Sequence, residues 1–375
     1  MATSRRQAST ALSACVLILG AYGFLDFAWC ARAPAVGVQP SLSRFTGPAL
    51  AVDSKPARLS HDRTGLLARG GEENSAAKAY TTGISWYLMH FIVSIGNDGI
   101  MKFLGSSLPP FQIVFLRFLT AALVLLPVAI TKGSEAFKTQ RLWMHGVRGS
   151  LLALGIGLWC RGLAIMPFAS CVVINNTMPF FKMLFAMLIL GENVGKQRWI
   201  ASIGGFIGCL IVFNPTAATF QPESLVLILS ACCFAMLDIM NKKYAFEESI
   251  VSMLFYGSIA TAIVSAYTAF TTWVPVQPMQ YLLFAALGMG ANALLYCLLK
   301  AFQYVDASAT CPYRYTEFVL SAIVGLLLFR EKPMASTLLG SAIILPSVIY
   351  CAYIETKPPA EKKEEAAASA APAAA

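Results

Sequence analysis

Charge is scarce in this sequence: charged residues make up 13% of the 375 residues, whereas hydrophobic residues make up 57%. A soluble domain carries roughly 25% charged residues, so the composition excludes an ordinary water-facing surface. The three histidines are scattered, and the ten cysteines form no CxxC pair and no cluster with histidine. We therefore expect neither a metal centre nor a cofactor, and we interpret the cysteines as small apolar residues.

What the sequence has instead is a succession of long apolar runs between residues 83 and 354, separated by short polar breaks. A run of about 20 apolar residues is long enough to cross a bilayer as a helix. The pattern predicts an all-α membrane protein with about ten transmembrane helices. The predicted spans are 83–104, 111–130, 149–165, 169–190, 200–213, 224–240, 250–270, 281–301, 307–329 and 336–354.

The net charge of +9 does not indicate nucleic acid, because the basic residues lie in loops and form no stripe interleaved with aromatic residues. Lysine and arginine occur in the loops after the second, fourth and sixth spans, whereas the loops 214–223 and 271–280 contain neither. The positive-inside rule then places both ends of the bundle on the basic side of the membrane.

The two ends of the chain differ from the apolar middle. Residues 1–30 have the layout of a secretory signal, with Arg5 and Arg6 before an apolar stretch, and residues 31–80 include a basic, serine- and proline-containing segment typical of a transit peptide. Together they resemble the bipartite leader of plastids bounded by extra membranes, so we expect an organelle membrane, with the plasma membrane as the alternative. A retained eleventh helix with a disordered linker is the other interpretation. Residues 357–375 predict a disordered tail.

The apolar middle is internally repeated. Charged residues recur at nearly one offset, as in the pairs Asp98 and Asp238, Lys102 and Lys242, Arg161 and Lys300, and Glu192 and Glu331. We expect two repeats, 81–215 and 216–356, with five spans each. Because five is odd, the second repeat is inverted in the membrane, a construction that secondary transporters use, with the substrate site between the halves. No GxxxxGK[ST] motif occurs, so we expect transport driven by a gradient or by exchange.

Several charges lie inside the predicted spans. Each would cost roughly 2.5–3.5 kcal/mol at the centre of a bilayer, so we expect them to face water, one another or a ligand. The candidate site residues of this kind are Asp98, Arg117, Lys182, Asp238, Arg314 and Glu317, joined by the polar Asn175 and Asn176. The structural alternative is that Asp98 pairs with Lys102, and Asp238 with Lys242, four residues along one helix.

The ninth span is the most polar of them. Pro312 frees a backbone carbonyl and is followed by Tyr313, Arg314, Tyr315 and Glu317. Arg314 and Glu317 are three residues apart and can pair with each other when no ligand is bound. The counterpart in the fourth span, 175–179, is also polar and contains a proline. Two interrupted helices of this kind are typical of a transporter binding site.

At these residues the chain resembles the drug/metabolite transporter superfamily, in its ten-span form with two EamA-like halves. The resemblance covers residues 80–356. The segments 234–243, 252–256, 299–302 and 305–315 resemble the rickettsial type of S-adenosylmethionine uptake transporters. The chain departs from those bacterial proteins in its long leader and in Arg330, where a glycine commonly precedes the glutamate.

The resemblance implies a carrier of S-adenosylmethionine, and exchange for S-adenosylhomocysteine is one way in which its transport would be driven. Glu317 or Asp238 would face the sulfonium, Arg314 the carboxylate, and Tyr313 and Tyr315 the adenine. The balance of acids and bases favours a zwitterionic or cationic solute over a phosphorylated one. Carriers of nucleotide-sugars, amino acids or phosphorylated metabolites remain alternatives with the same fold.

A membrane-embedded enzyme or scaffold is the alternative of another class. An enzyme should show a nucleophile–base pair or metal ligands within the spans, and the sequence shows neither pattern, so we expect a transporter and no enzyme. The glycines at 204, 205 and 208 have the spacing of close helix contacts, which serve packing or a homodimer. The partners we expect are thus a small-molecule substrate, the lipid bilayer and a second copy, and no nucleic acid.

Overall fold

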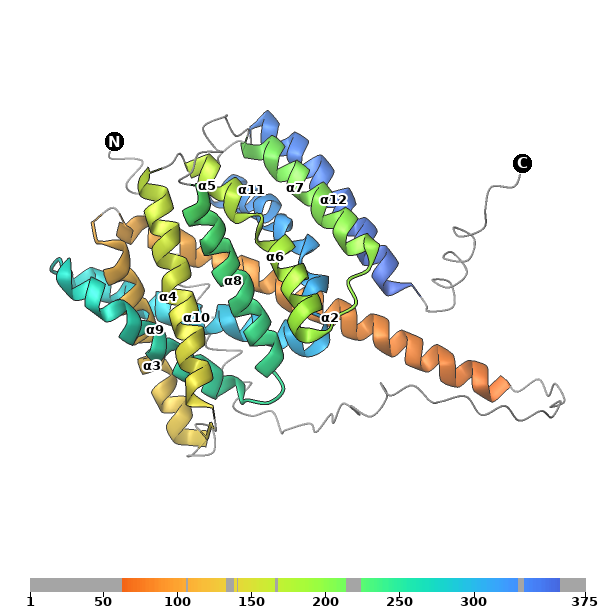
Figure 1. Ribbon diagram of the computed structural model, residues 1–375, viewed down its shortest axis with the longest axis horizontal. Helices are drawn as coiled ribbons and strands as arrows, with labels where there is room; N and C mark the ends of the chain where they lie inside the picture. The colour runs from red at the N-terminus through yellow and green to blue at the C-terminus, as the bar shows by residue number, and fades with distance from the viewer. Residues whose placement is uncertain are drawn as a thin grey trace.

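The computed structural model describes residues 63–105, 107–132, 138–139, 141–165, 168–213, 224–329 and 334–357. All regular structure in these ranges is helical (Figure 1). The predicted signal-like segment and the C-terminal tail beyond Lys357 lie outside the described residues. The α-helices are α2 (Arg63–Gly105), α3 (Pro110–Lys132), α4 (Leu142–Ile165), α5 (Phe168–Asn175), α6 (Met178–Phe185), α7 (Lys196–Phe213), α8 (Ser224–Tyr244), α9 (Ile250–Thr271), α10 (Pro278–Tyr304), α11 (Thr316–Phe329) and α12 (Ala335–Thr356).

Helices stand at each of the ten ranges that the apolar pattern predicts. Six runs within the described residues are long and apolar enough to cross a bilayer, judged by length and composition. They are Pro110–Val128, Cys171–Leu190, Ser224–Tyr244, Ile250–Thr271, Pro278–Tyr304 and Ala335–Thr356. An all-helical membrane protein is therefore confirmed, while the crossing of the bilayer by all ten helices stays a prediction.

The first helix differs from the prediction at its start. Helix α2 begins at Arg63 rather than at residue 83, inside the range 31–80 that the sequence assigns to a transit-like, disordered region. The added turns contain leucine, alanine and glutamate, which favour helix, and no proline. This early part of α2 projects from the body of the molecule in Figure 1.

Four pairs of helices form the main packing of the bundle. Helix α2 packs on α10, α4 on α8, α3 on α9 and α7 on α12. Figure 1 shows α7 and α12 side by side over their length. Small residues allow this last approach: Gly208 lies against Gly340 and Ile344, and Gly204 lies against Ser347. The glycine spacing of the fifth span thus serves packing within one chain.

The largest buried cluster lies where α2, α8, α10 and the ninth-span segment meet. It includes Tyr87, Phe91, Phe302, Tyr313 and Tyr315. Charged groups are buried beside these rings, among them Lys182 at 2% exposed and Asp238 at 9%. A buried charge requires a partner, so the groups that Lys182 and Asp238 contact define the candidate site.

Candidate functional site

Two interrupted helices meet at the centre of the site. Helix α5 ends at Asn175, and α6 begins at Met178 with Pro179 in its first turn, so the path of the fourth span is broken at Asn176 and Thr177. The ninth span is broken too, into the 3₁₀ helices Ser308–Thr310 and Pro312–Tyr315 ahead of α11. Both interruptions fall where the sequence has a proline, which cannot donate a backbone hydrogen bond.

The two interruptions are joined by a hydrogen bond. The hydroxyl of Tyr315 donates to the carbonyl oxygen of Asn176 at 3.2 Å, and the Tyr315 side chain is fully buried. The amide of Asn176 donates back within its own helix, to the carbonyl of Val172 at 2.7 Å. The carbonyl that the break leaves without a helical partner is therefore satisfied by the other broken span.

Lys182 and Asp238 form a buried ion pair next to these breaks. The Lys182 Nζ lies 2.7 Å from Oδ2 of Asp238. It also lies over two aromatic rings, 4.9 Å from the centroid of Phe302 and 5.4 Å from that of Tyr87. Both distances are within the reach of a cation–π interaction. Three helices, α2, α8 and α10, thus contribute one side chain each to a cage around the ammonium group that α6 supplies.

The other four predicted charges each lie near a charge of opposite sign. Arg314 interacts most strongly with Glu317 among the charged groups around it, and Arg117 interacts with Asp98. The hydroxyl of Ser94 on α2 lies close enough to the carboxylates of Asp98 and Glu317 to interact with them, at the contact of α2 with α11. The six charges are three acids and three bases, and the direct ion pair that the described residues show among them is Lys182–Asp238.

Hydrogen-bonding capacity is left over in this region. Among the described residues, four buried side-chain atoms have no hydrogen-bond partner: Asn97 Oδ1, Arg117 Nε, Asn175 Oδ1 and Arg314 Nε. A buried polar atom without a partner costs about 1–3 kcal/mol. Two donors and two acceptors of this kind, beside the six charges, are groups that water or a polar ligand would satisfy.

Two local pairings weighed from the sequence have different outcomes. Asp238 is hydrogen-bonded to Lys182 and not to Lys242, whose Nζ donates to the carbonyls of Phe302 and Val305 at 2.7 Å each. The Asp238–Lys242 pairing is therefore wrong, because Lys242 satisfies the free carbonyls at the end of α10 instead. The side chain of Lys102, the expected partner of Asp98, lies outside the described part.

Tyr313 points away from the charged residues. Its hydroxyl lies 3.2 Å from that of Tyr80. Both phenols line a pocket of about 210 Å³ together with Ile84, Ala352 and other residues of α2 and α12. Of the predicted residues, Tyr315, Asn176, Lys182 and Asp238 lie at or beside the breaks. Arg314 and Glu317 interact with each other and with Asp98, and Arg117 interacts with Asp98, whereas Tyr313 is separated from these groups.

Three residues of the site carried no signal in the sequence. Tyr87 and Phe302 are aromatic residues within apolar spans, and such residues usually pack in a core. Ser94 is a single hydroxyl in the first span. A helical wheel could have placed Tyr87 and Ser94 on the face of Asp98, but their partners on α10 and α11 depend on tertiary packing.

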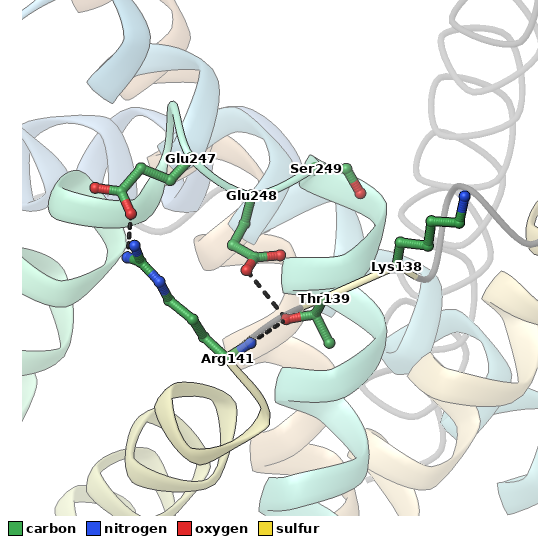
Figure 2. A pocket seen from close by; sticks show the side chains of 6 residues that line it. All are labelled: Lys138, Thr139, Arg141, Glu247, Glu248 and Ser249. Carbon is green, nitrogen blue, oxygen red and sulfur yellow. Dashed lines mark hydrogen bonds and ion pairs between the residues drawn. The ribbon is translucent and has the colours of Figure 1, made fainter.

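A second polar pocket lies in the loops, outside the predicted spans. It has a volume of about 470 Å³ and is lined by Lys138, Thr139, Arg141, Glu247, Glu248 and Ser249. Figure 2 shows Arg141 reaching Glu247 and Thr139 reaching Glu248, so the segment before α4 is tied to the loop before α9. The Arg141–Glu247 pair is about half exposed, at 45% and 46%.

An all-helical bundle with interrupted helices and paired charges between its spans defines a membrane transporter rather than an enzyme. The EamA-like transporter family model matches the chain twice, over residues 81–214 and 221–353. The chain belongs to the EamA-like transporter family. Lys182 lies in the first matched segment and Asp238 in the second.

Individual members of the family with curated names are also similar to this chain. The chain is 42% identical to the S-adenosylmethionine uptake transporter of Rickettsia prowazekii (strain Madrid E), over 78% of this chain and 99% of the relative. It is 29% identical to a riboflavin transporter of Vibrio cholerae serotype O1, over 74% of this chain and 92% of the relative. A crystal structure with 18% identity shares the fold, with a TM-score of 0.62 over 75% of this chain and 98% of its own.

Proposed function

We propose that this protein carries S-adenosylmethionine across an organelle membrane, in exchange for S-adenosylhomocysteine. The observation that supports this most directly is the charge balance of the site, where Lys182, Arg314 and Arg117 stand against Asp238, Glu317 and Asp98. S-adenosylmethionine has a sulfonium, an ammonium and a carboxylate, so it requires acids and a base together. A phosphate carrier would instead cluster lysine and arginine. The rickettsial relatives support the same substrate.

The proposed site uses the residues around the two breaks. Arg314, paired with Glu317 in the empty state, turns to the substrate carboxylate. Tyr315, Asn175 and Asn176 frame the nucleoside from the two broken helices. The unpartnered atoms of Arg314 and Asn175 supply one donor and one acceptor to it.

The proposed mechanism is alternating access between two inverted repeats of five spans each, 81–215 and 216–356. In support, the first helix of each half packs on the third of the other, as α2 on α10 and α8 on α4. The second helices of the two halves, α3 and α9, pack on each other, and so do the fifth helices, α7 and α12. A two-fold relation between halves produces this pattern. Cysteines introduced at Lys138 and Thr272, which follow the second span of each half, should label from opposite sides of the membrane; labelling from one side would contradict the inverted arrangement.

The proposed location is a plastid envelope membrane, reached through the leader in residues 1–80. A fluorescent fusion of the full chain should label that envelope, and removal of the leader should abolish the labelling. Fluorescence of the plasma membrane from both forms would contradict the location and leave the substrate proposal intact.

A ligand panel tests the substrate. A ligand that binds the folded protein raises its unfolding temperature by mass action. The purified full chain should be stabilised by S-adenosylmethionine and S-adenosylhomocysteine, and not by riboflavin or a nucleotide-sugar. Stabilisation by riboflavin alone would contradict the proposed substrate and would favour riboflavin, the substrate named for the relatives of lower identity.

A further inference from the structure

We propose that Lys182 is a tethered competitor of the substrate: its ammonium occupies the subsite that receives the sulfonium of S-adenosylmethionine, and the substrate displaces it. The inference rests on the proposed function for the identity of the cation. Of the two carboxylates that the sequence offers for the sulfonium, the inference selects Asp238, which forms the cage with Tyr87 and Phe302. The other carboxylate, Glu317, then interacts with Arg314.

The geometry of the cage is that of a cation receptor. One carboxylate oxygen lies 2.7 Å from the ammonium, and two ring faces lie 4.9 and 5.4 Å from it. A carboxylate together with aromatic faces is the set that recognises onium ligands in proteins. A sulfonium has no N–H to donate, so charge attraction and ring faces are the interactions left to it, and the cage offers both.

The occupant of the cage can withdraw. Lysine carries a compact charge on a flexible four-carbon stem, and it enters the cage from α6, directly after the break at Asn176 and Thr177. Lys182 and a sulfonium cannot both occupy the cage, because two positive charges would then share one buried carboxylate. The substrate therefore binds only to the fraction of molecules whose lysine has left, which lowers its apparent affinity.

A ligand without a sulfonium behaves differently. S-adenosylhomocysteine has a neutral thioether in its place, and this thioether gains nothing from the Asp238 carboxylate and does not compete with the lysine for it. Removal of the Lys182 charge should therefore strengthen binding of the sulfonium compound selectively. A general opening of the site would strengthen both.

The experiment compares the full chain with Lys182→Met, which keeps the length of the side chain. We expect Lys182→Met to bind S-adenosylmethionine about tenfold more tightly, and S-adenosylhomocysteine within about twofold of the unaltered protein. The control is Lys243→Met, an exposed lysine on the same helix as Asp238, over the ring of Tyr244 at 5.9 Å. It should change neither affinity. Equal gains for both ligands, or no gain for the sulfonium compound, would overturn the inference.

A second variant covers the case in which Lys182→Met does not fold with Asp238 left unpaired. Lys182→Met/Asp238→Asn removes both charges, and it should bind the two adenosyl compounds with equal affinity. A preference for the sulfonium compound in this variant would overturn the inference.

The failure of the proposed function is a separate result. If the unaltered protein and Lys182→Met both fail to bind either adenosyl compound, the substrate proposal is wrong. The cage is then tested with tetramethylammonium chloride: greater thermal stabilisation of Lys182→Met than of the unaltered protein supports the cage, and equal stabilisation overturns it.

Discussion

The hydroxyl of Tyr315 donates a hydrogen bond to the carbonyl of Asn176 and so connects the two interrupted helices of the bundle. One residue follows Pro312, and the other precedes Pro179, in segments 139 positions apart. The bond fixes the distance between the breaks, and through it the position of the charged residues on either side. The two helix interruptions are thus joined into one structural feature of the site.

Tyr315→Phe removes this donor while keeping the ring against Gly205. The Asn176 carbonyl is then buried without its partner, so we expect a loss of about 1 kcal/mol in unfolding free energy. The measurement is the unfolding temperature in detergent. Tyr267→Phe, at a tyrosine that is 81% exposed, is the control and should leave the temperature unchanged. An equal effect of the two changes on the unfolding temperature would show that the hydrogen bond between Tyr315 and Asn176 does not contribute to stability.

Gly208→Ala tests the contact between α7 and α12. A methyl group at this position would lie 2.9 Å from the carbonyl oxygen of Gly340, on the backbone of the facing helix. Because backbone atoms cannot turn aside, we expect a destabilisation of about 1–3 kcal/mol, measured by thermal unfolding. Gly146→Ala is the matched control, since a methyl group there meets nothing within 4 Å. Unchanged stability in Gly208→Ala would contradict the close packing.

Arg198→Ala and Arg141→Ala compare a buried ion pair with an exposed one. Arg198 donates to Glu355 at 2.8 Å, and the two side chains are 8% and 11% exposed. Its loss removes the cation of a buried pair, at a cost of about 3–5 kcal/mol, while Gln197 still donates to the Glu355 carboxylate at 3.1 Å. Arg141 pairs with Glu247 on the surface, so its loss should cost at most about 1 kcal/mol. Thermal unfolding distinguishes the two, and a reversed order would contradict the assigned burial.

Asp238→Asn and Glu317→Gln separate the two carboxylates that the sequence offers for the sulfonium. Asp238→Asn removes the charge of the cage, so we expect the variant to bind S-adenosylmethionine no more tightly than S-adenosylhomocysteine. Glu317→Gln releases Arg314 and should keep the preference. Equilibrium binding of both ligands to both variants is the measurement. The opposite pattern would give the sulfonium to Glu317.

Much of the fold was predictable because hydropathy and proline act locally. The apolar runs locate a helix at each of the ten predicted ranges, although not the start of α2 at Arg63, and Pro179 and Pro312 locate the two breaks. The partner of Asp238 was not predictable, because helical spacing offers Lys242 four residues away, whereas the bundle brings Lys182 from 56 residues away. Local spacing states which pairs are within reach, and tertiary packing decides between them.

The two tyrosines of the ninth span illustrate the same limit at closer range. Tyr313 and Tyr315 are two residues apart, and both were predicted to face the ligand. Side chains two residues apart point about 160° apart around the axis of an α-helix and about 120° apart in a 3₁₀ helix, so either geometry separates them. Tyr315 therefore faces the fourth span while Tyr313 faces Tyr80. The sequence could not show which of the two tyrosines would face the fourth span, because that depends on how the segment packs in the bundle.

Uptake of radiolabelled S-adenosylmethionine into proteoliposomes that contain the purified full chain measures the proposed transport itself. We expect saturable uptake that S-adenosylhomocysteine inhibits, that rises when the vesicles are preloaded with S-adenosylhomocysteine, and that Asp238→Asn reduces at least about tenfold. Uptake no greater than that of protein-free vesicles, or uptake that Asp238→Asn leaves unchanged, would contradict it.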